Sequence, residues 1–397
     1  MLETRIAKEL AYISQAGLAR RITELYFVNP AQAQDRTGKT YLVLASNNYL
    51  GFTHAPEVIE AASRAALKFG TGSSGSRLTT GGTFIASELE KRLADFKHSE
   101  SALVFNTGYM TNLGVLYGLV QTGDVVFSDE LNHASIIDGC RISRCKVVVY
   151  KHNDMADLQR LLETEIVTGQ RFIVTDGVFS MDGDIADLPS LAVLKKQFNA
   201  CLIVDDAHGV GVIGNDGSGT ASHYGLTDVI DLQVGTLSKA LAAEGGYVAG
   251  KKILIDYLIN RSRPFIFSTA LAPATLAAAN AALLLLQTQA SKYLDSLRAN
   301  SRLMRRLLLE GGLNVVEGIT PIIPVVIGEA GLTMQFADRL KSKGILVSGI
   351  RPPTVPRGES RLRITVTAAH CEEQLRQAAQ IITALWQELK HGEKKEG

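Results

Sequence analysis

The sequence has few cysteines, no excess of charge of either sign and no long apolar run. Its only cysteines are Cys140, Cys145, Cys201 and Cys371 in 397 residues. No two form a CxxC pair, which argues against a disulfide framework or a zinc site. Lys and Arg (41) balance Asp and Glu (40), leaving a net charge of +1. No basic field therefore favours nucleic acid or a membrane surface, and we expect a protein of the reducing cytoplasm.

The longest uncharged stretch predicts a buried helix and not a membrane span. No charge occurs between Arg263 and Lys292, but polar residues interrupt this stretch, and its longest purely apolar run covers only residues 281–286. That run is far too short to cross a bilayer, so we expect a buried helix that begins at Pro273. Over residues 2–13, apolar side chains recur at helical spacing among charges, which predicts an amphipathic helix and not a secretory signal peptide.

Seven short apolar runs alternate with helical segments between residues 99 and 250. These runs are SALVF, DVVFS, KVVVY, RFIVTD, CLIVDD, IDLQVG and GGYVAG. Their continuous hydrophobicity is typical of strands buried on both faces of a mainly parallel sheet. The alternation of strands and helices predicts an open, doubly wound α/β domain.

The pattern changes after the Ala- and Leu-rich helix. PIIPVVI, GILVSGI and RLRITV predict strands around a helix near residues 331–343, and a final helix is expected over residues 372–390. This is the composition of a smaller α+β domain. We divide the chain into an N-terminal helix and lead-in segment (1–45), a large cofactor-binding domain (46–290) and a small C-terminal domain (291–397). A hydrophobic content of 46% is enough for such cores.

The most polar segments of the predicted sheet follow three of its strands. They are TDGVFSMDG (175–183), VDDAHGVG (204–211) and GTLSK (235–239). Ligands of open α/β sheets gather at this edge. Lys239 follows an apolar strand and precedes small residues, so burial is expected to lower the pKa of its amine and make it a Schiff-base nucleophile.

Pyridoxal phosphate accounts for this set of residue types. Lys239 can hold the cofactor as an imine, Asp205 can face the pyridine nitrogen, and Thr236 can bind the phosphate. The glycine-containing segment 105–112 predicts a helix start whose free amides also suit phosphate, and His133 can stack on the ring. Competing motifs lack context, since neither GxGxxG match (70–75 and 209–214) opens a helix after a strand, and GxxxxGK[ST] and GxSxG are absent.

Eight motifs, in order along the chain, resemble those of the α-oxoamine synthases. They are SNNYLG, GTGSSGSRLTTGG, ELNHASIIDG, DGVFSMDGD, VDDAHGVGVIG, GTLSKA, FIFSTA and IRPPTVPRGESRLRIT. Together they span about residues 40–370. The resemblance implies a pyridoxal-phosphate enzyme of the aspartate-aminotransferase fold (fold type I), with a large mainly parallel sheet domain and a smaller α+β domain.

The resemblance also implies roles for individual residues. The groups expected at the cofactor ring are Lys239 (imine), Asp205 (pyridine nitrogen), His133 (stacking and proton movement), and His208 and Ser180 (near the 3-hydroxyl). The groups expected at the cofactor phosphate are Gly108, Tyr109 and Thr236, with Ser268 or Thr269 from the neighbouring subunit of a homodimer. The groups expected at the substrate are Asn47 and Arg363 for the amino-acid carboxylate, and Arg20 or Arg21 for a distal carboxylate.

Family members condense an amino acid with an acyl thioester and lose carbon dioxide. IRPPTVP followed by RLRITVTAAH resembles members that use L-alanine and a pimeloyl thioester, on CoA or acyl carrier protein, in biotin biosynthesis. SDELNHASIIDG and RPFIFSTA are equally similar to members that use glycine and acetyl-CoA, and we favour alanine and the pimeloyl thioester over this alternative. More distant alternatives are an aminotransferase or lyase with the same cofactor and a non-catalytic protein that retains the fold. The presence of Lys239, Asp205, His133 and His208 argues against the last.

Overall fold

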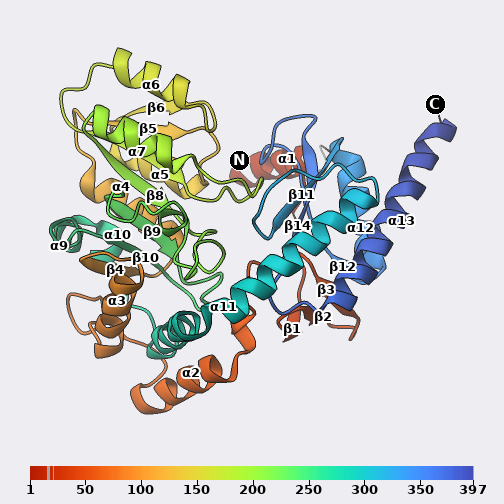
Figure 1. Cartoon of the computed structure of the whole chain (residues 1–397), viewed down its shortest axis with the longest axis horizontal. Coiled ribbons are helices and arrows are strands. Elements are labelled where there is room, and N and C mark those ends of the chain that lie inside the picture. The colour runs from red at the N-terminus through yellow and green to blue at the C-terminus, as the bar shows by residue number, and fades with distance from the viewer. Residues whose placement is uncertain (16–17, 21, 397) are drawn as a thin grey trace.

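A seven-stranded sheet forms the centre of the larger part of the protein (Figure 1). The computed structural model describes residues 1–15, 18–20 and 22–396. In sheet order, the strands are β4 (Ser101–Phe105), β10 (Gly246–Gly250), β9 (Leu232–Thr236), β8 (Ala200–Asp205), β7 (Arg171–Asp176), β5 (Val125–Asp129) and β6 (Lys146–Tyr150). Only β10 runs antiparallel to its neighbours. Each apolar run predicted as a strand overlaps one of these seven, which confirms the mainly parallel sheet.

Consecutive side chains of the central strands enter different cores, as a doubly covered sheet requires. In β5, Val125 and Phe127 join a core with α6 (Met155–Thr164) and α7 (Leu188–Gln197), whereas Val126 joins a core with α4, α5 and α9. The bounds of these three helices are Gly108–Leu119, Ala134–Ser143 and Lys252–Arg261. Two short helices, α8 (Thr220–His223) and α10 (Arg263–Ile266), complete this part. Burial on both faces explains why these strands lack a polar alternation.

A second sheet organises the C-terminal part. It has the order β11 (Ile322–Gly328), β14 (Ser360–Thr365) and β13 (Ser348–Ile350), and it packs with α12 (Ala330–Ser342) and α13 (Glu372–Glu396) around a separate core. The expected single strand GILVSGI is divided, because its first residues form β12 (Ile345–Leu346) in another sheet. That sheet has the order β1 (Tyr26–Asn29), β2 (Gln32–Gln34), β3 (Thr40–Val43) and β12. The lead-in segment is therefore joined to the C-terminal part by a parallel pairing between β3 and β12.

One long helix, α11 (Pro273–Glu310), crosses from the larger part to the smaller one (Figure 1). It begins at the predicted proline, and non-helical backbone at Gln289 (φ −133°, ψ 26°) marks a kink near the predicted boundary at 290. Its first half packs on α2 (Pro56–Phe69) and α3 (Phe84–Phe96), which follow a 3-10 turn at Phe52–His54. No helix of the described residues could cross a membrane.

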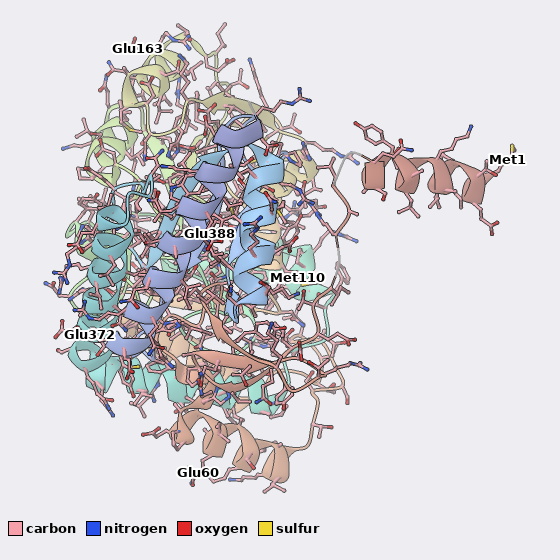
Figure 2. All side chains as sticks on the ribbon, turned by 90° about the vertical axis from the view of Figure 1, so that its right-hand side faces the viewer. Met1, Glu60, Met110, Glu163, Glu372 and Glu388 are labelled. Carbon is pink, nitrogen blue, oxygen red and sulfur yellow. The ribbon has the colours of Figure 1, made fainter. Side chains whose placement is uncertain are left out.

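The amphipathic N-terminal helix is confirmed as α1 (Leu2–Gln15). None of its residues is buried, and Figure 2 shows it projecting away from the body of the chain, with Met1 at its outer end. Leu2, Ile6 and Leu10 are between 46% and 60% exposed. An apolar stripe of this kind has no packing partner within the described chain.

Candidate active site

A cavity of about 230 Å³ lies where β7, β8 and β9 end. It is lined by Thr107, Gly108, Tyr109, His133, Ser135, Asp176, Ser180, Asp205, Ala207, His208, Thr236, Ser238 and Lys239. Most of the residues expected to bind a cofactor are thus brought together. A larger groove of about 610 Å³ lies between α2, α3 and α11, but none of the predicted site residues lines it. We therefore place the chemistry at the strand ends.

Lys239 is partly buried, at the end of a hydrogen-bonded chain. Its Nζ lies 2.9 Å from His208 Nε2, and His208 Nδ1 lies 2.6 Å from the Tyr49 hydroxyl. Burial lowers the pKa of Lys239 to about 8 and, together with the charge of Lys239, holds the pKa of His208 well below its usual value. A neutral imidazole has one donor and one acceptor nitrogen, so the ring links the amine to the phenol. The lowered pKa increases the fraction of neutral amine near neutral pH, and the neutral amine is the form that attacks an aldehyde.

Two aspartates end neighbouring parallel strands beside this lysine. Asp176 and Asp205 are direct Cα partners of β7 and β8. The Asp205 carboxylate accepts hydrogen bonds from Asn112 Nδ2 (2.6 Å) and the amide of Ala207 (3.0 Å). Burial, with Asp205 as the next cause, raises the pKa of Asp176 well above its usual value, although its Oδ2 accepts the His133 amide at 3.0 Å. The site therefore favours a protonated Asp176 next to Asp205.

The start of α4 forms an anion cradle with the segment after β9. Thr107 caps the helix through a 3.0 Å bond from the Met110 amide, and the first two helical residues, Gly108 and Tyr109, line the cavity. Across from them, the Thr236 and Ser238 hydroxyl oxygens lie 2.7 Å apart. A Cβ on Gly108 would lie 3.2 Å from Thr236 Cβ, so glycine is what allows this close approach. Amides and hydroxyls together suit a phosphate.

His133 caps the next helix while its ring lines the cavity. Its Nδ1 accepts the Ser135 amide at 3.2 Å and lies 2.7 Å from the Ser135 hydroxyl, at the start of α5. Burial lowers the pKa of the imidazole. The Tyr109 ring meets it edge-on at 6.4 Å, and the Tyr109 hydroxyl donates to Asp138 outside the cavity. A neutral ring with one nitrogen fixed has its orientation set by the helix cap.

Arg363 is buried without a counter-charge. Its guanidinium donates to Asn47 Oδ1 (3.2 Å), Thr365 Oγ1 (3.0 Å) and the Ser180 carbonyl. Among the described residues, no carboxylate lies within ion-pair distance of it. Arg361 on the same strand is equally buried but pairs with acidic side chains. Because buried charges are normally paired, Arg363 is a candidate to bind the carboxylate of a ligand.

Like Asn47 and Arg363, the predicted residues Ser268, Thr269 and Arg20 do not line the cavity of the single chain. Thr269 forms an isolated bridge with Ser76, its carbonyl accepts a hydrogen bond from the Asn106 side chain, and Ser268 is partly buried beside it. Arg20 is exposed. Arg21 lies outside the described residues. Their expected roles stay predictions.

Several residues in or beside the cavity were not predicted from the sequence. They are Tyr49, Asn112, Ser135, Asp176 and Ser238. Asp176 could have been found, because it ends its strand in the same way as Asp205. Asn112 and Tyr49 carry no such signal, since one lies inside a helix and the other is a fully buried aromatic residue.

A mainly parallel sheet with a lysine after β9 and aspartates at the ends of β7 and β8 is the arrangement of fold type I pyridoxal-phosphate transferases. The comparisons agree with this class. The profile of the family "Aminotransferase class I and II" matches residues 39–382.

Relatives that match nearly the whole chain identify the subgroup within this class. The chain is 47% identical to the 8-amino-7-oxononanoate synthase of Lysinibacillus sphaericus, over 94% of this chain and 96% of the relative. It is 49% identical to that of Trichlorobacter lovleyi, over 97% and 98%. Among solved structures, Sphingomonas wittichii serine palmitoyltransferase is 30% identical, with a TM-score of 0.91 over 98% of this chain and 97% of that one. The 8-amino-7-oxononanoate synthase of Francisella tularensis is 30% identical, with a TM-score of 0.76 over 89% and 98%. The chain belongs to the α-oxoamine synthases of the class I and II aminotransferase family.

Proposed function

We propose that the protein condenses L-alanine with a pimeloyl thioester, with loss of carbon dioxide, to give 8-amino-7-oxononanoate for biotin biosynthesis. The observation that carries the proposal is the pairing, at one site, of a buried lysine amine with pKa about 8 and a buried guanidinium without a counter-charge. The substrate class follows from the names of relatives that match nearly the whole chain at 47–49% identity.

The donor set fits pyridoxal phosphate. Lys239 would hold the cofactor aldehyde, Asp205 would face the pyridine nitrogen, and His133 would stack on the ring. The cradle of Gly108, Tyr109, Thr236 and Ser238 would take the phosphate, with His208 and Ser180 near the 3-hydroxyl. When bound, the cofactor supplies an electron sink that stabilises negative charge at the substrate α-carbon.

The other residues bind the substrate and move its proton. Arg363 and Asn47 would hold the alanine carboxylate, since a guanidinium matches a carboxylate with two parallel hydrogen bonds. Lys239 Nζ would take the α-proton, because an amine with pKa about 8 accepts protons near neutral pH and returns them readily. Arg20 or Arg21 would meet the distal carboxylate of the pimeloyl chain.

We also propose a homodimer in which Ser268 or Thr269 reaches the phosphate cradle of the other subunit. Two observations support this assembly. The segment around Thr269 is held against Ser76 and Asn106 and does not line the cavity of its own chain. The apolar stripe of α1 projects without a partner.

A two-by-two assay tests the function. Alanine or glycine is combined with pimeloyl-CoA or acetyl-CoA, and CoA release is followed with a thiol reagent. We expect release with alanine and pimeloyl-CoA; release confined to glycine and acetyl-CoA would refute the proposal, as would amino-group transfer to a keto acid without any thioester. Borohydride treatment of the coloured protein, with Lys239→Ala as the control, should fix the cofactor on Lys239 alone.

A further inference from the structure

His152 lies between two carboxylates in the turn after β6. Its Nδ1 is 3.0 Å from Asp129 Oδ1, and its Nε2 is 2.8 Å from Asp184 Oδ2. The His152 and Phe179 rings pack edge to face with their centroids 4.4 Å apart, and 23% of the His152 side chain is exposed. A carboxylate only accepts hydrogen bonds, and a neutral imidazole has only one N–H. Both contacts are satisfied together only by the doubly protonated ring.

The surrounding charges favour that protonated ring. Burial lowers the pKa of His152, but the hydrogen bonds and charges of Asp129 and Asp184 outweigh burial and raise the pKa to about 10. Glu130 accepts the backbone amide of His152 at 2.9 Å, and Asp157 accepts the amide of Lys151 at 3.1 Å. The charged groups around the ring are thus mainly acidic.

Asp129 connects His152 to the segment that carries the stacking candidate His133. Its Oδ1 also accepts the Leu131 amide (2.8 Å), and its Oδ2 accepts the Asn153 amide (3.0 Å). These bonds fix the turn that leads from the end of β5 into His133, the N-cap of α5.

Asp184 connects the same ring to the loop that carries Ser180. Its Oδ2 also accepts Asn153 Nδ2 at 3.0 Å, and its backbone carbonyl accepts the Phe179 amide at 3.0 Å. The Ser180 carbonyl in this loop accepts a hydrogen bond from Arg363. The loop therefore touches the cavity and the substrate-carboxylate candidate at once.

We propose that His152 is a positioning residue. As an imidazolium, it bonds to Asp129 in the segment before His133 and to Asp184 in the Ser180 loop, and so it holds these two segments together. The distance between the His133 ring and the loop that contacts Arg363 is then fixed. The inference rests on the proposed function and assigns this half-buried histidine, which lines no part of the cavity, a role in substrate binding and turnover.

The first experiment measures the protonation of His152 directly. Protein labelled with ¹³C at histidine Cε1 is titrated by NMR, and the His152 signal is assigned by its absence from His152→Gln. We expect this signal to stay that of an imidazolium up to at least pH 8. In Asp184→Asn, which replaces a carboxylate by a neutral amide, its midpoint should fall by at least about one pH unit. A ring that titrates near pH 6.5 in both proteins overturns the proposal.

The second experiment measures the consequence for the site. In His152→Gln, we expect the KM for alanine to rise and kcat to fall, each about tenfold, as for loss of a charge-assisted hydrogen bond. The visible circular dichroism of the bound cofactor should change as well. His98→Gln is the control, because His98 is exposed and meets one carboxylate, Asp216, at 3.6 Å. Unchanged kinetics and dichroism in His152→Gln refute the positioning role.

Misfolding of His152→Gln and failure of the proposed function can each be distinguished from failure of the positioning role. If His152→Gln does not fold, Asp184→Asn provides the kinetic test, since the Asp184 side chain is 31% exposed. In that variant, the KM for alanine should begin to rise at a lower pH than in the wild type, in step with the NMR midpoint. If the KM rises at the same pH in both proteins, the proposal is contradicted. The NMR and dichroism signals need no thioester, so absence of CoA release by the wild-type protein counts against the proposed function alone.

Discussion

Asn112 fixes the carboxylate that is proposed to face the pyridine nitrogen. The Asn112 amide donates to Asp205 Oδ2 at 2.6 Å and to Ser135 Oγ at 2.8 Å, and Ser135 in turn contacts His133 Nδ1. Asn112 is 3% exposed, so its amide is shielded from bulk water. A hydrogen bond to a charged partner contributes about 1.5–3 kcal/mol. Asn112→Ala should therefore lower kcat/KM roughly 10- to 150-fold, since about 1.4 kcal/mol corresponds to one factor of ten.

The assay is CoA release from pimeloyl-CoA at varied alanine, together with the dissociation constant of pyridoxal phosphate. Asn280→Ala is the matched control, because Asn280 is a partly buried helix residue that also binds a charged group, Arg92, but lies at the groove remote from the site. Asn112→Ala that keeps kcat/KM and cofactor affinity within about twofold of the wild type would show that Asp205 does not depend on this bond.

Two other predictions concern an arginine and a buried histidine. Arg363→Lys should raise the KM for alanine on the order of tenfold with a smaller effect on kcat, because an ammonium cannot make the two parallel bonds of a guanidinium; exposed Arg376→Lys is the control, and an unchanged KM would argue against the carboxylate role. His370 accepts the Thr367 amide at 2.9 Å, and burial lowers its pKa to about 4. The unfolded chain then binds more protons between pH 4 and 6.5, so the free energy of unfolding should rise with pH across that window, by at most about 3.4 kcal/mol. Urea unfolding at several pH values should show a shallower rise for His370→Gln than for the control His223→Gln; equal slopes would contradict the assignment.

The sequence predicted the sheet and the cofactor side of the site because both depend on local order along the chain. Lys239 and Asp205 each follow an apolar strand, and strand ends of a parallel sheet meet at one edge. Asn112 and His152 were not predicted, because their roles arise from contacts with residues 93 and 32 positions away. From the sequence alone, a histidine in an acidic turn is predicted to be a surface residue. Only the fold shows that Asp184 lies beside the ring. The division of GILVSGI between two sheets also depends on a pairing with a distant strand, β3.

The long helix α11 makes the two parts of the protein one folding unit. Leu286 and Leu297 belong to the core beside the large sheet, whereas Met304 and Leu308, a few turns later, belong to the C-terminal core. Asn300 between them donates to the carbonyls of Thr367 and His370. Because one continuous helix contributes side chains to both cores, a chain cut before Leu286 would separate the large-sheet core from Leu286 and Leu297, which pack in it.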